Sequence, residues 1–469
     1  LEQGLLGLRH AGLIRQRPDQ GSRQFVFRHP IIQEVCYGMQ LKVRRVALHG
    51  AVAQAMESYY QDRLDEFAAL IAYHYGLAEM PVRSATFEAR AAHWIGVSDS
   101  GQAVKRWLRV HSLLAGQERS GEVARLRVTL GLHIGRLGWR EGMSPGDMVQ
   151  IIEEAIAHAS AQDTRLVQLL RIAQGRARWG GGGSADDYVL QVRRAMATLE
   201  PSDLGRRAVL NAFLCQALTW AGFLDEALAA NDAAMADAAS IERADIDYIG
   251  FDVAQWLRGL RFKLLVRIDD VQAVGASVGP LMTVLDSTAD PVIRMVVHHT
   301  LAESGFFAND AELATRHAAL LADIARRHAS PYVVVYSRLC TGLSEASRGD
   351  YADASESFAD TLAMIRKFKV TPEAEAEVLS HRALSLLRGG ALDLAISVAE
   401  EARDVARQRT NRFAECFSLI VLARARAARD GAQDPLALHC RQGAAALLTA
   451  TGAKALRRLM AASNTESLA

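Results

Sequence analysis

Histidines and carboxylates in two short stretches of the sequence have the residue types and spacing to do chemistry. In FVFRHPIIQEVCYG, residues 25–38, His29 lies between a strand-like alternation and a helix opened by proline. In HHTLAE, residues 298–303, His299 and Glu303 are four residues apart, so one helix face could present both to a single ion. No third ligand is evident nearby, and buried histidines are common in helical repeats. We therefore expect no metal site there.

Motifs for phosphate binding and metalloprotease chemistry are absent from the sequence. A P-loop needs Gly-Lys-Ser/Thr, and none of the six lysines follows a glycine. Neither Gly-x-Gly-x-x-Gly nor His-Glu-x-x-His occurs. The sequence thus predicts no catalysis and no catalytic residues within these 469 residues.

Composition narrows the class of protein further. The 54 Lys and Arg balance 53 Asp and Glu, so no net positive charge favours nucleic acid, and direct nucleic-acid binding is not expected. The five cysteines contain no Cys-x-x-Cys pair, which is typical of reduced thiols in the cytoplasm. No apolar run approaches the ~18 residues of a membrane helix. The chain begins at Leu1 inside an amphipathic pattern, so we expect its natural N-terminus upstream.

Apolar residues recur at helical spacing along almost the whole chain. Runs such as EVLSHRALSLLRGGALDLAISVAEEARDVARQ place them at i, i+3, i+4 and i+7, the pattern of helices with one buried face. Convincing strand-like alternation occurs only in GLIRQRPDQGSRQFVFRHP, residues 12–30, around a Pro-Asp-Gln-Gly turn at 18–21. The sequence predicts one β-hairpin there and helix from about Ile31 onward.

Glycines in turn-like contexts mark a repeat. Gly349, Gly390 and Gly431 are 41 residues apart (390−349 and 431−390), and Gly222 lies close to three such periods before Gly349. Such a ladder indicates one supersecondary unit used about nine times. Steps of the same length toward the N-terminus reach the glycines at 180–183, 142 and 101, a degenerate copy lies at Gly305, and no clean turn marks the copy expected near Asp269.

Small and bulky residues keep fixed positions around the clearest of these glycines. Gly349 has Gly342 seven residues before it, and Tyr351, Ala354 and Phe358 two, five and nine residues after it. Facing small residues let two antiparallel helices approach closely, and a bulky neighbour fills the gap at the turn. The spacing resembles the tetratricopeptide repeat, which usually has 34 residues. Seven extra residues, about two helical turns, predict longer helices rather than extra loops.

These patterns together predict an all-α chain, a tetratricopeptide-like solenoid of helical hairpins preceded by the end of a winged-helix subdomain with one β-hairpin. Residues 1–58 would form the C-terminal part of that subdomain and a connecting helix. Residues 59–460 would form the repeat array, with a period of about 41, and residues 461–469 a polar tail. Gly-Gly-Gly-Gly-Ser at 180–184 falls on the ladder, which favours a long turn between paired helices over a domain linker.

The segment from Phe25 to Glu57 resembles the winged-helix exit of bacterial STAND-type ATPases. It is most similar to the class found in multidomain proteins with an N-terminal class III adenylate/guanylate cyclase, a central ATPase and a C-terminal tetratricopeptide array. The pattern is a phenylalanine, Arg-His, an apolar pair, Gln-Glu-Val and a tyrosine, then a basic helix with a late histidine. The matching residues are Phe27, Arg28, His29, Ile31, Ile32, Gln33, Glu34, Val35, Tyr37, Arg44, Arg45 and His49.

The resemblance implies a role for His29. In related STAND ATPases, including plant resistance proteins, a histidine at this junction contacts the β-phosphate of bound ADP and holds the closed state. An imidazole can donate to a phosphate oxygen, and a helix N-terminus favours an anion. The resistance-protein motif continues with aspartate, whereas Pro30 follows here. The alternative is structural, with the imidazole capping the helix or packing under the hairpin.

Two functions stay open on this basis. The chain is either the non-catalytic regulatory arm of a cytoplasmic ATPase–nucleotide cyclase, or the sensor arm of a STAND/MalT-like transcription regulator with its DNA-binding module elsewhere. In both, a protein or small-molecule ligand would bind the concave face of the array, and no membrane would be involved. ATP or ADP and Mg are expected for an upstream ATPase module, with no cofactor in this chain. The ending AKALRRLMAASNTESLA leaves no room for a DNA-reading unit after the array.

Overall fold

The computed structural model describes residues 2–17, 24–96, 98–328 and 330–461. The predicted Pro-Asp-Gln-Gly turn at 18–21 and residues 462–469 of the predicted polar tail lie outside the described residues. The chain forms two compact units, residues 1–126 and residues 127–469, and each is described by itself. The domain boundaries expected after residues 58 and 460 remain predictions.

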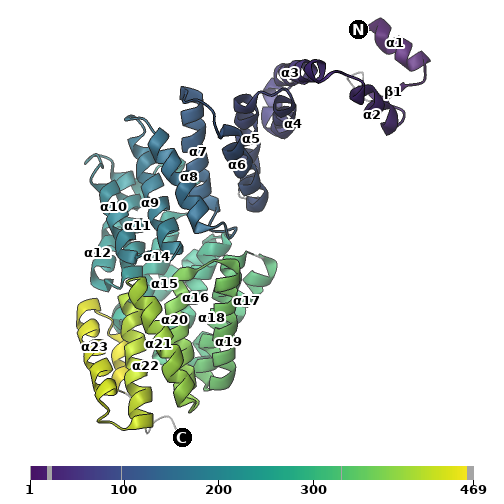
Figure 1. The fold of residues 1–469 in the computed structure, drawn as a ribbon. Coiled ribbons are helices and arrows are strands. Elements are labelled where there is room, and N and C mark those ends of the chain that lie inside the picture. The colour runs from purple at the N-terminus through teal and green to yellow at the C-terminus, as the bar shows by residue number, and fades with distance from the viewer. Residues whose placement is uncertain (1, 18–23, 97, 329, 462–469) are drawn as a thin grey trace. The chain divides into compact units, whose positions relative to one another are not determined.

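The first unit opens with a helix, a two-stranded hairpin and a second helix, in the predicted order (Figure 1). Its elements are α1 (Glu2–His10), β1 (Ile14–Arg17), β2 (Gln24–Phe27), α2 (Pro30–Gly38), α3 (Lys42–Tyr59), the 3₁₀ helix η1 (Gln61–Arg63), α4 (Leu64–Leu77), α5 (Pro81–Ile95) and α6 (Ser100–Leu114). β1 and β2 pair antiparallel, with Ile14 opposite Phe27. Pro30 takes the first position of α2, where its missing N–H leaves no hydrogen bond unmade.

Small side chains bring α3, α4 and α5 into close contact. Ala53 of α3 and Ala68 of α4 are fully buried in a cluster that also holds the rings of Tyr75 and Phe87. The two rings stack with centroids 5.6 Å apart. The Tyr75 hydroxyl donates to Glu57 Oε2 over 2.6 Å, so the polar end of this buried tyrosine is satisfied.

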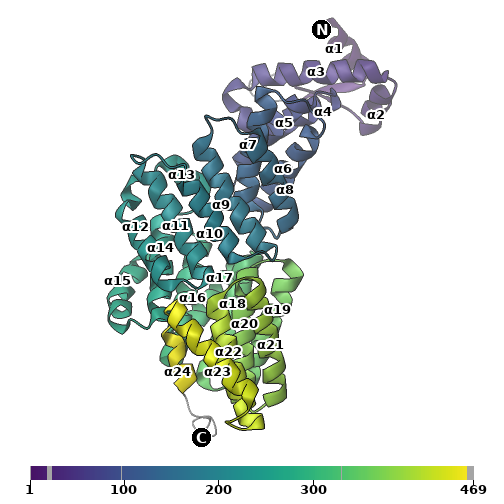
Figure 2. The ribbon, with the colours of Figure 1, turned by 60° about the vertical axis from the view of Figure 1, so that its left-hand side comes forward.

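The second unit is built from antiparallel helices joined by short turns (Figures 1 and 2). Its helices are α7 (Gly121–Leu137), which begins in the first unit, α8 (Pro145–His158), α9 (Thr164–Gly180), α10 (Ala185–Met196), α11 (Leu204–Ala221), α12 (Leu224–Ala236), η2 (Ala238–Ser240), α13 (Arg243–Ile249), α14 (Val253–Ile268), α15 (Val271–Ser287), α16 (Pro291–Ala308), α17 (Ala311–Arg327), α18 (Pro331–Arg348), α19 (Tyr351–Phe368), η3 (Pro372–Ala374), α20 (Glu375–Arg388), α21 (Leu392–Gln408), α22 (Arg412–Asp430), α23 (Pro435–Thr451) and α24 (Ala455–Ala461). After β2 the described residues contain no strand, so the prediction of helix from about Ile31 onward is confirmed.

The α18–α19 hairpin confirms the predicted register. Gly349 ends α18 in the left-handed conformation, with φ 87°. A Cβ atom on Gly342 would lie 2.6 Å from the Phe358 ring, so this position admits only hydrogen as a side chain. Ala354 and Phe358 are fully buried. Both helices have 18 residues, whereas a 34-residue repeat leaves 17 for each helix with its turn, so the helices are longer as predicted.

Two glycines that the repeat spacing places in turns do not lie in turns. Gly101 is the second residue of α6 rather than a turn, and Gly305 lies inside α16. The residues that end α14 and α16 in the left-handed conformation are Asp269 and Asn309, with φ 61° and 57°. Aspartate and asparagine tolerate this conformation because their short polar side chains bond locally. The four glycines at 180–183 do form the end of α9 and the turn before α10, as predicted.

Helices that are far apart in the sequence lie against one another in the second unit (Figure 2). Arg267 of α14 bonds Glu377 of α20 over 2.5 Å, and Arg412 of α22 bonds Asp186 of α10 over 2.8 Å. The backbone N–H of Ala185 donates to the carbonyl of Arg409 over 2.9 Å. The coil of hairpins therefore turns back on itself. We call the side of α7–α14 that faces α16–α22 the inner face. The hairpins of α16–α22 cover part of it.

All five cysteines are free thiols, and only Cys36 is exposed. Burial raises the pKa of the Cys215 thiol to about 12, and it raises that of Cys416 to about 12 as well. These buried thiols are therefore poor nucleophiles at neutral pH. Among the described helices, none is both long enough and apolar enough to cross a membrane.

Candidate ligand site on the inner face of the repeat array

His29 lies directly before α2, at the predicted junction of hairpin and helix. Its extended backbone, with φ −132° and ψ 136°, makes it the N-cap residue. The side chain is exposed and makes no capping hydrogen bond, so the alternative in which the imidazole caps the helix is wrong. The ring is free to face a ligand or another module. The nucleotide-sensing role of His29 stays a prediction.

Two residues of the STAND-like pattern, Tyr37 and His49, are in contact. The Tyr37 hydroxyl lies 2.9 Å from His49 Nε2, and His49 Nδ1 lies 2.8 Å from His74 Nδ1. A hydrogen bond between two Nδ1 atoms requires one of them to be unprotonated. Burial, and then the charge of His49, lowers the pKa of His74. This chain of bonds ties α2, α3 and α4 together behind the hairpin.

Glycines bring α7 close to its neighbours at the edge of the inner face. A Cβ atom on Gly131 would lie 2.4 Å from the Cβ of Ala155 in α8, and one on Gly135 would lie 2.6 Å from the Cβ of Ala173 in α9. The helices can approach this closely only because no side chain separates them. As a result, the end of α7 carries Trp139 onto the inner face.

A shallow hollow with a cavity volume of about 60 Å³ opens on this face. One wall comes from α7 and the turn after it, from α9 and from α11, with Trp139 in that turn, Trp179 in α9 and Trp220 in α11. The opposite wall comes from Tyr332 in α18 and from residues 369–373, between α19 and η3. At least 112 residues separate the two walls (332−220), so only the fold-back of the coil creates the hollow.

Aromatic rings dominate the walls. Trp179 and Trp220 stack face to face, with centroids 4.1 Å apart and planes 5° apart. Trp139 meets Tyr332 edge to face at 4.8 Å, which joins the two walls directly. Rings of this size give a ligand a large, rigid apolar contact. The tryptophans are scattered singly in the sequence, and only the structure brings them together.

Guanidinium groups surround Trp139. Those of Arg140 and Arg176 lie 5.0 and 4.9 Å from its ring centroid, within cation–π range. Arg136 lines an adjoining hollow together with Arg176 and the Tyr248 ring. Burial lowers the pKa of Arg136 and of Arg140, although both remain cations at neutral pH.

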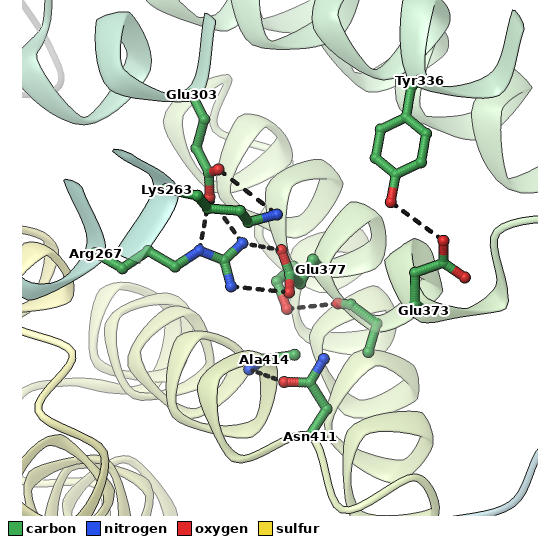
Figure 3. A network of polar contacts seen from close by, with 10 residues as sticks. Lys263, Arg267, Glu303, Tyr336, Glu373, Glu377, Asn411 and Ala414 are labelled. Atoms are coloured by element: carbon green, nitrogen blue, oxygen red, sulfur yellow. Dashed lines mark hydrogen bonds and ion pairs between the residues drawn. The ribbon is translucent and has the colours of Figure 1, made fainter. Parts of the chain in front are cut away.

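One carboxyl group faces the same hollow. Glu373 accepts a hydrogen bond from the Tyr336 hydroxyl over 3.2 Å (Figure 3). Burial raises the pKa of Glu373, while Arg176 acts in the opposite sense. The hollow thus combines apolar walls with a few polar groups, which is the usual composition of a small-molecule site.

A buried ion network lies beside the hollow (Figure 3). Arg267 bonds Glu303 Oε1 over 2.8 Å and Glu377 Oε2 over 2.5 Å, and its guanidinium lies 4.0 Å from the Phe413 ring centroid. Burial alone would raise the pKa of both carboxyls, but Arg267 and then Lys263 hold them below the usual range. The network joins α14, α16, α20 and α22.

The histidine–carboxylate pair expected to bind no metal is part of the packed interior. Glu303 belongs to the Arg267 network, and the His299 ring packs edge to face on Tyr336 at 4.9 Å. His298 bonds the ring of His317, with Nδ1 atoms 3.0 Å apart. In the described part of the chain, no group of three or more His, Cys, Asp or Glu is placed to hold a metal ion.

The pentapeptide Gly-Ala-Ser-Val-Gly at 275–279 matches Gly-x-Ser-x-Gly, the pattern of hydrolase nucleophiles. In those enzymes the serine lies on a sharp strand-to-helix turn. Ser277 instead lies inside α15, and its hydroxyl donates to the Ala273 carbonyl over 2.7 Å. The match is therefore a coincidence of helix composition.

Comparisons with known proteins find similar chains among solved structures alone. No family model and no curated protein matches the chain. Solved structures that it resembles include a Rap protein complexed with competence and sporulation factor (11% identity, 81% of this chain and 97% of that one, TM-score 0.41). A STAND protein with a tetratricopeptide repeat sensor from Pyrococcus horikoshii matches at 13% identity and TM-score 0.42. The match covers 97% of this chain and 60% of that protein's chain. The APC/C hetero-tetramer Cut9–Hcn1 matches at 14%, over 90% of this chain and 83% of that chain, with TM-score 0.43.

At these identities and TM-scores the likeness carries no argument about fold or function. The class follows from the chain's own geometry: hairpins of paired helices with left-handed turn residues, stacked in sequence order. The chain is a tetratricopeptide-like helical solenoid, with one antiparallel hairpin near the start of its described residues.

Proposed function

We propose that this chain is the non-catalytic sensor arm of a signalling ATPase–nucleotide cyclase. A protein or small-molecule ligand binds the inner face of the repeat array. Binding is relayed through the winged-helix segment to an upstream nucleotide switch, which binds ATP or ADP with Mg in the cytoplasm. The observation that supports this most is the hollow, because its walls come from hairpins on both sides of the fold-back.

The physical requirement for such a relay is differential binding. A ligand shifts a protein between two arrangements only if it binds one of them more tightly. Trp139 and Tyr332 lie on opposite walls, so any opening or tightening of the coil would change the distance between them. A ligand that touches both therefore favours one spacing, and couplings of this kind are typically ~1–3 kcal/mol.

The first unit carries a surface suited to docking another module. Among the described residues, 27 large apolar side chains are exposed, and 12 of these lie in the first 59 residues. Apolar exposure on this scale is typical of a segment that packs against another module. We expect the nucleotide-binding module to cover it. The most exposed side chains there are Val43, Leu41, Met39, Tyr59 and Ile31, at 82, 79, 78, 72 and 68%.

His29→Ala tests the relay at its nucleotide end. The variant is made in the protein expressed with its upstream reading frame, and release of bound ADP is followed with a fluorescent analogue. Loss of one charge-assisted hydrogen bond to phosphate should speed ADP release by about tenfold. His10→Ala removes another exposed histidine of the same unit and should leave release unchanged.

Equal release rates for wild type and His29→Ala would remove His29 from the proposal. The upstream reading frame decides the rest. A Gly-Lys-Ser/Thr loop with cyclase aspartates supports the ATPase–cyclase. A DNA-binding module in their place would make the chain the sensor arm of a STAND/MalT-like regulator, and a frame with neither would contradict both.

A further inference from the structure

The three arginines around Trp139 lack carboxylate partners. Among the described residues, Arg136, Arg140 and Arg176 form no ion pair and no hydrogen bond through their side chains. The Nε atom of Arg136, and the Nε and Nη2 atoms of Arg140, are buried without any acceptor. Buried donors left unpaired cost free energy, and charged donors cost most.

Some arginines elsewhere in the array have acid partners, although Arg382 has none among the described residues. Arg267 bonds two glutamates, and the equally buried Arg206 bonds Asp245 over 2.6 Å. Around Trp139 the acids act only through space: Asp247 acts on Arg136, Asp290 acts on Arg140, and Glu373 lines the same hollow as Arg176. Arg136, Arg140 and Arg176 thus place three cations around one ring without a bonded acid in the described part of the chain, an arrangement that suits an anion from outside the chain.

The hollow also offers donors and flat walls beside these cations. The Trp179 indole nitrogen and the Thr371 hydroxyl are buried without partners, and both residues line it. Arg176 lines the hollow next to Trp139, while Tyr332 forms the far wall. An occupant that satisfies this set has an acidic group at one end and a flat apolar body.

We propose that the hollow binds a small organic anion. Its carboxylate or phosphate is held by Arg176, with Arg136 and Arg140 adding positive potential, and its apolar body lies against Trp139 and Tyr332. Arginine recognises both acidic groups by paired hydrogen bonds, so the structure assigns their shared chemistry. This inference deepens the proposed function by naming the ligand class, and it rests on the hollow being the sensor's site.

Titration calorimetry on the 469-residue chain with four probes tests the proposal. Indole-3-acetate and phenyl phosphate carry the two acidic groups, and indole-3-acetamide and phenol are their neutral counterparts. We expect at least one anion to bind saturably and about tenfold more tightly than its neutral counterpart. Quenching of tryptophan fluorescence should accompany binding, since three tryptophans line the hollow. The tighter anion identifies the acidic group.

Arg176→Gln locates the site. Its affinity for the anion should fall by about 10- to 100-fold. Arg171→Gln removes the same charge from α9 at a position outside the hollow and should bind as wild type does. Arg140→Gln serves as the second variant if circular dichroism shows that Arg176→Gln does not fold, and it should bind about tenfold more weakly.

Failure of the inference and failure of the proposed function are distinguishable. Absence of saturable anion binding, equal affinity of the neutral probes, or full affinity in the Arg176→Gln variant overturns the anion site and leaves the sensor proposal standing. Anion binding that is lost in Arg176→Gln, but that leaves ADP release from the full-length protein unchanged at saturation, supports the site and overturns the sensor proposal.

Discussion

At the scale of single residues, the array depends on close contacts between small and large side chains. Phe358 is fully buried in the space that Gly342 leaves open, with no room for a further atom at the glycine. Phe358→Ala should lower the free energy of unfolding by ~3–5 kcal/mol, because it removes the ring and leaves a cavity. Urea unfolding followed by circular dichroism measures the loss.

Phe368→Ala is the matched control, since it removes the same ring from the same helix at a position that is 39% exposed. It should cost about 1 kcal/mol, as less apolar surface leaves water there. Similar losses for the two variants would contradict the register that places Phe358 between the paired helices.

At the scale of elements, the sequence predicts paired helices well and their turns less well. The 41-residue spacing of Gly349 and Gly390 is visible because only glycine adopts their backbone freely. Asn309 and Asp269 occupy the same left-handed position one and two hairpins before Gly349, but many aspartates and asparagines in the sequence do not end helices. Their role becomes visible only in the fold.

The two candidate sites also differ in how far the sequence locates them. His29 could be located from sequence because a strand pattern, a proline and a helix pattern meet at one point. The arginine cluster could not, since Arg136 and Tyr332 are 196 residues apart (332−136) and the curvature of the coil brings their regions together. The local signal was the spacing of Gly131 and Gly135 on α7, which marks a helix that packs closely on its neighbours.

Contacts between elements across the fold-back can be tested at the Arg267 network. Arg267→Met leaves Glu303 and Glu377 buried together with only Lys263 as a nearby cation, 3.7 Å from Glu303. Breaking a buried ion network in this way should cost ~3–5 kcal/mol, measured as the change in the free energy of unfolding in urea. Arg338→Met breaks the exposed pair with Asp360 and should cost less than about 1 kcal/mol. Equal costs would mean that water reaches the Arg267 network.

At the scale of the whole molecule, buried histidines make stability depend on pH. Burial lowers the pKa of His298, His317 and His381 to about 4 from the usual 6.5. These rings stay neutral in the folded chain while the unfolded chain takes up protons below about pH 6.5. Stability is therefore intact above pH 6.5 and is lost as the pH falls toward 4. The free energy of unfolding should fall between pH 7 and 5, by up to ~1.4 kcal/mol per pH unit for each histidine. Urea unfolding curves recorded at several pH values measure this fall.

Carboxylates also take up protons at the lower end of this range. A histidine variant is therefore needed to assign the pH dependence of stability to the buried rings. His381→Asn removes one of the buried rings and should flatten the pH dependence between 6.5 and 5. His439→Asn removes an exposed histidine of the same unit and should leave the dependence as it is. An unchanged slope in the His381 variant would assign the acid sensitivity to other groups.

The bonds between distant hairpins also decide how the second unit comes apart. In an open solenoid each repeat touches only its neighbours, so fraying at a terminus costs the rest very little. Here Arg458 of α24 holds Asp269 over 2.8 Å, and Arg412 holds Asp186, so the last hairpins are cross-braced to the first and middle ones. Truncation at the C-terminus removes partners from helices some 190 to 230 positions earlier (458−269 = 189, 412−186 = 226). Together with the buried Arg267 network, these bonds should make melting more collective than in an open solenoid.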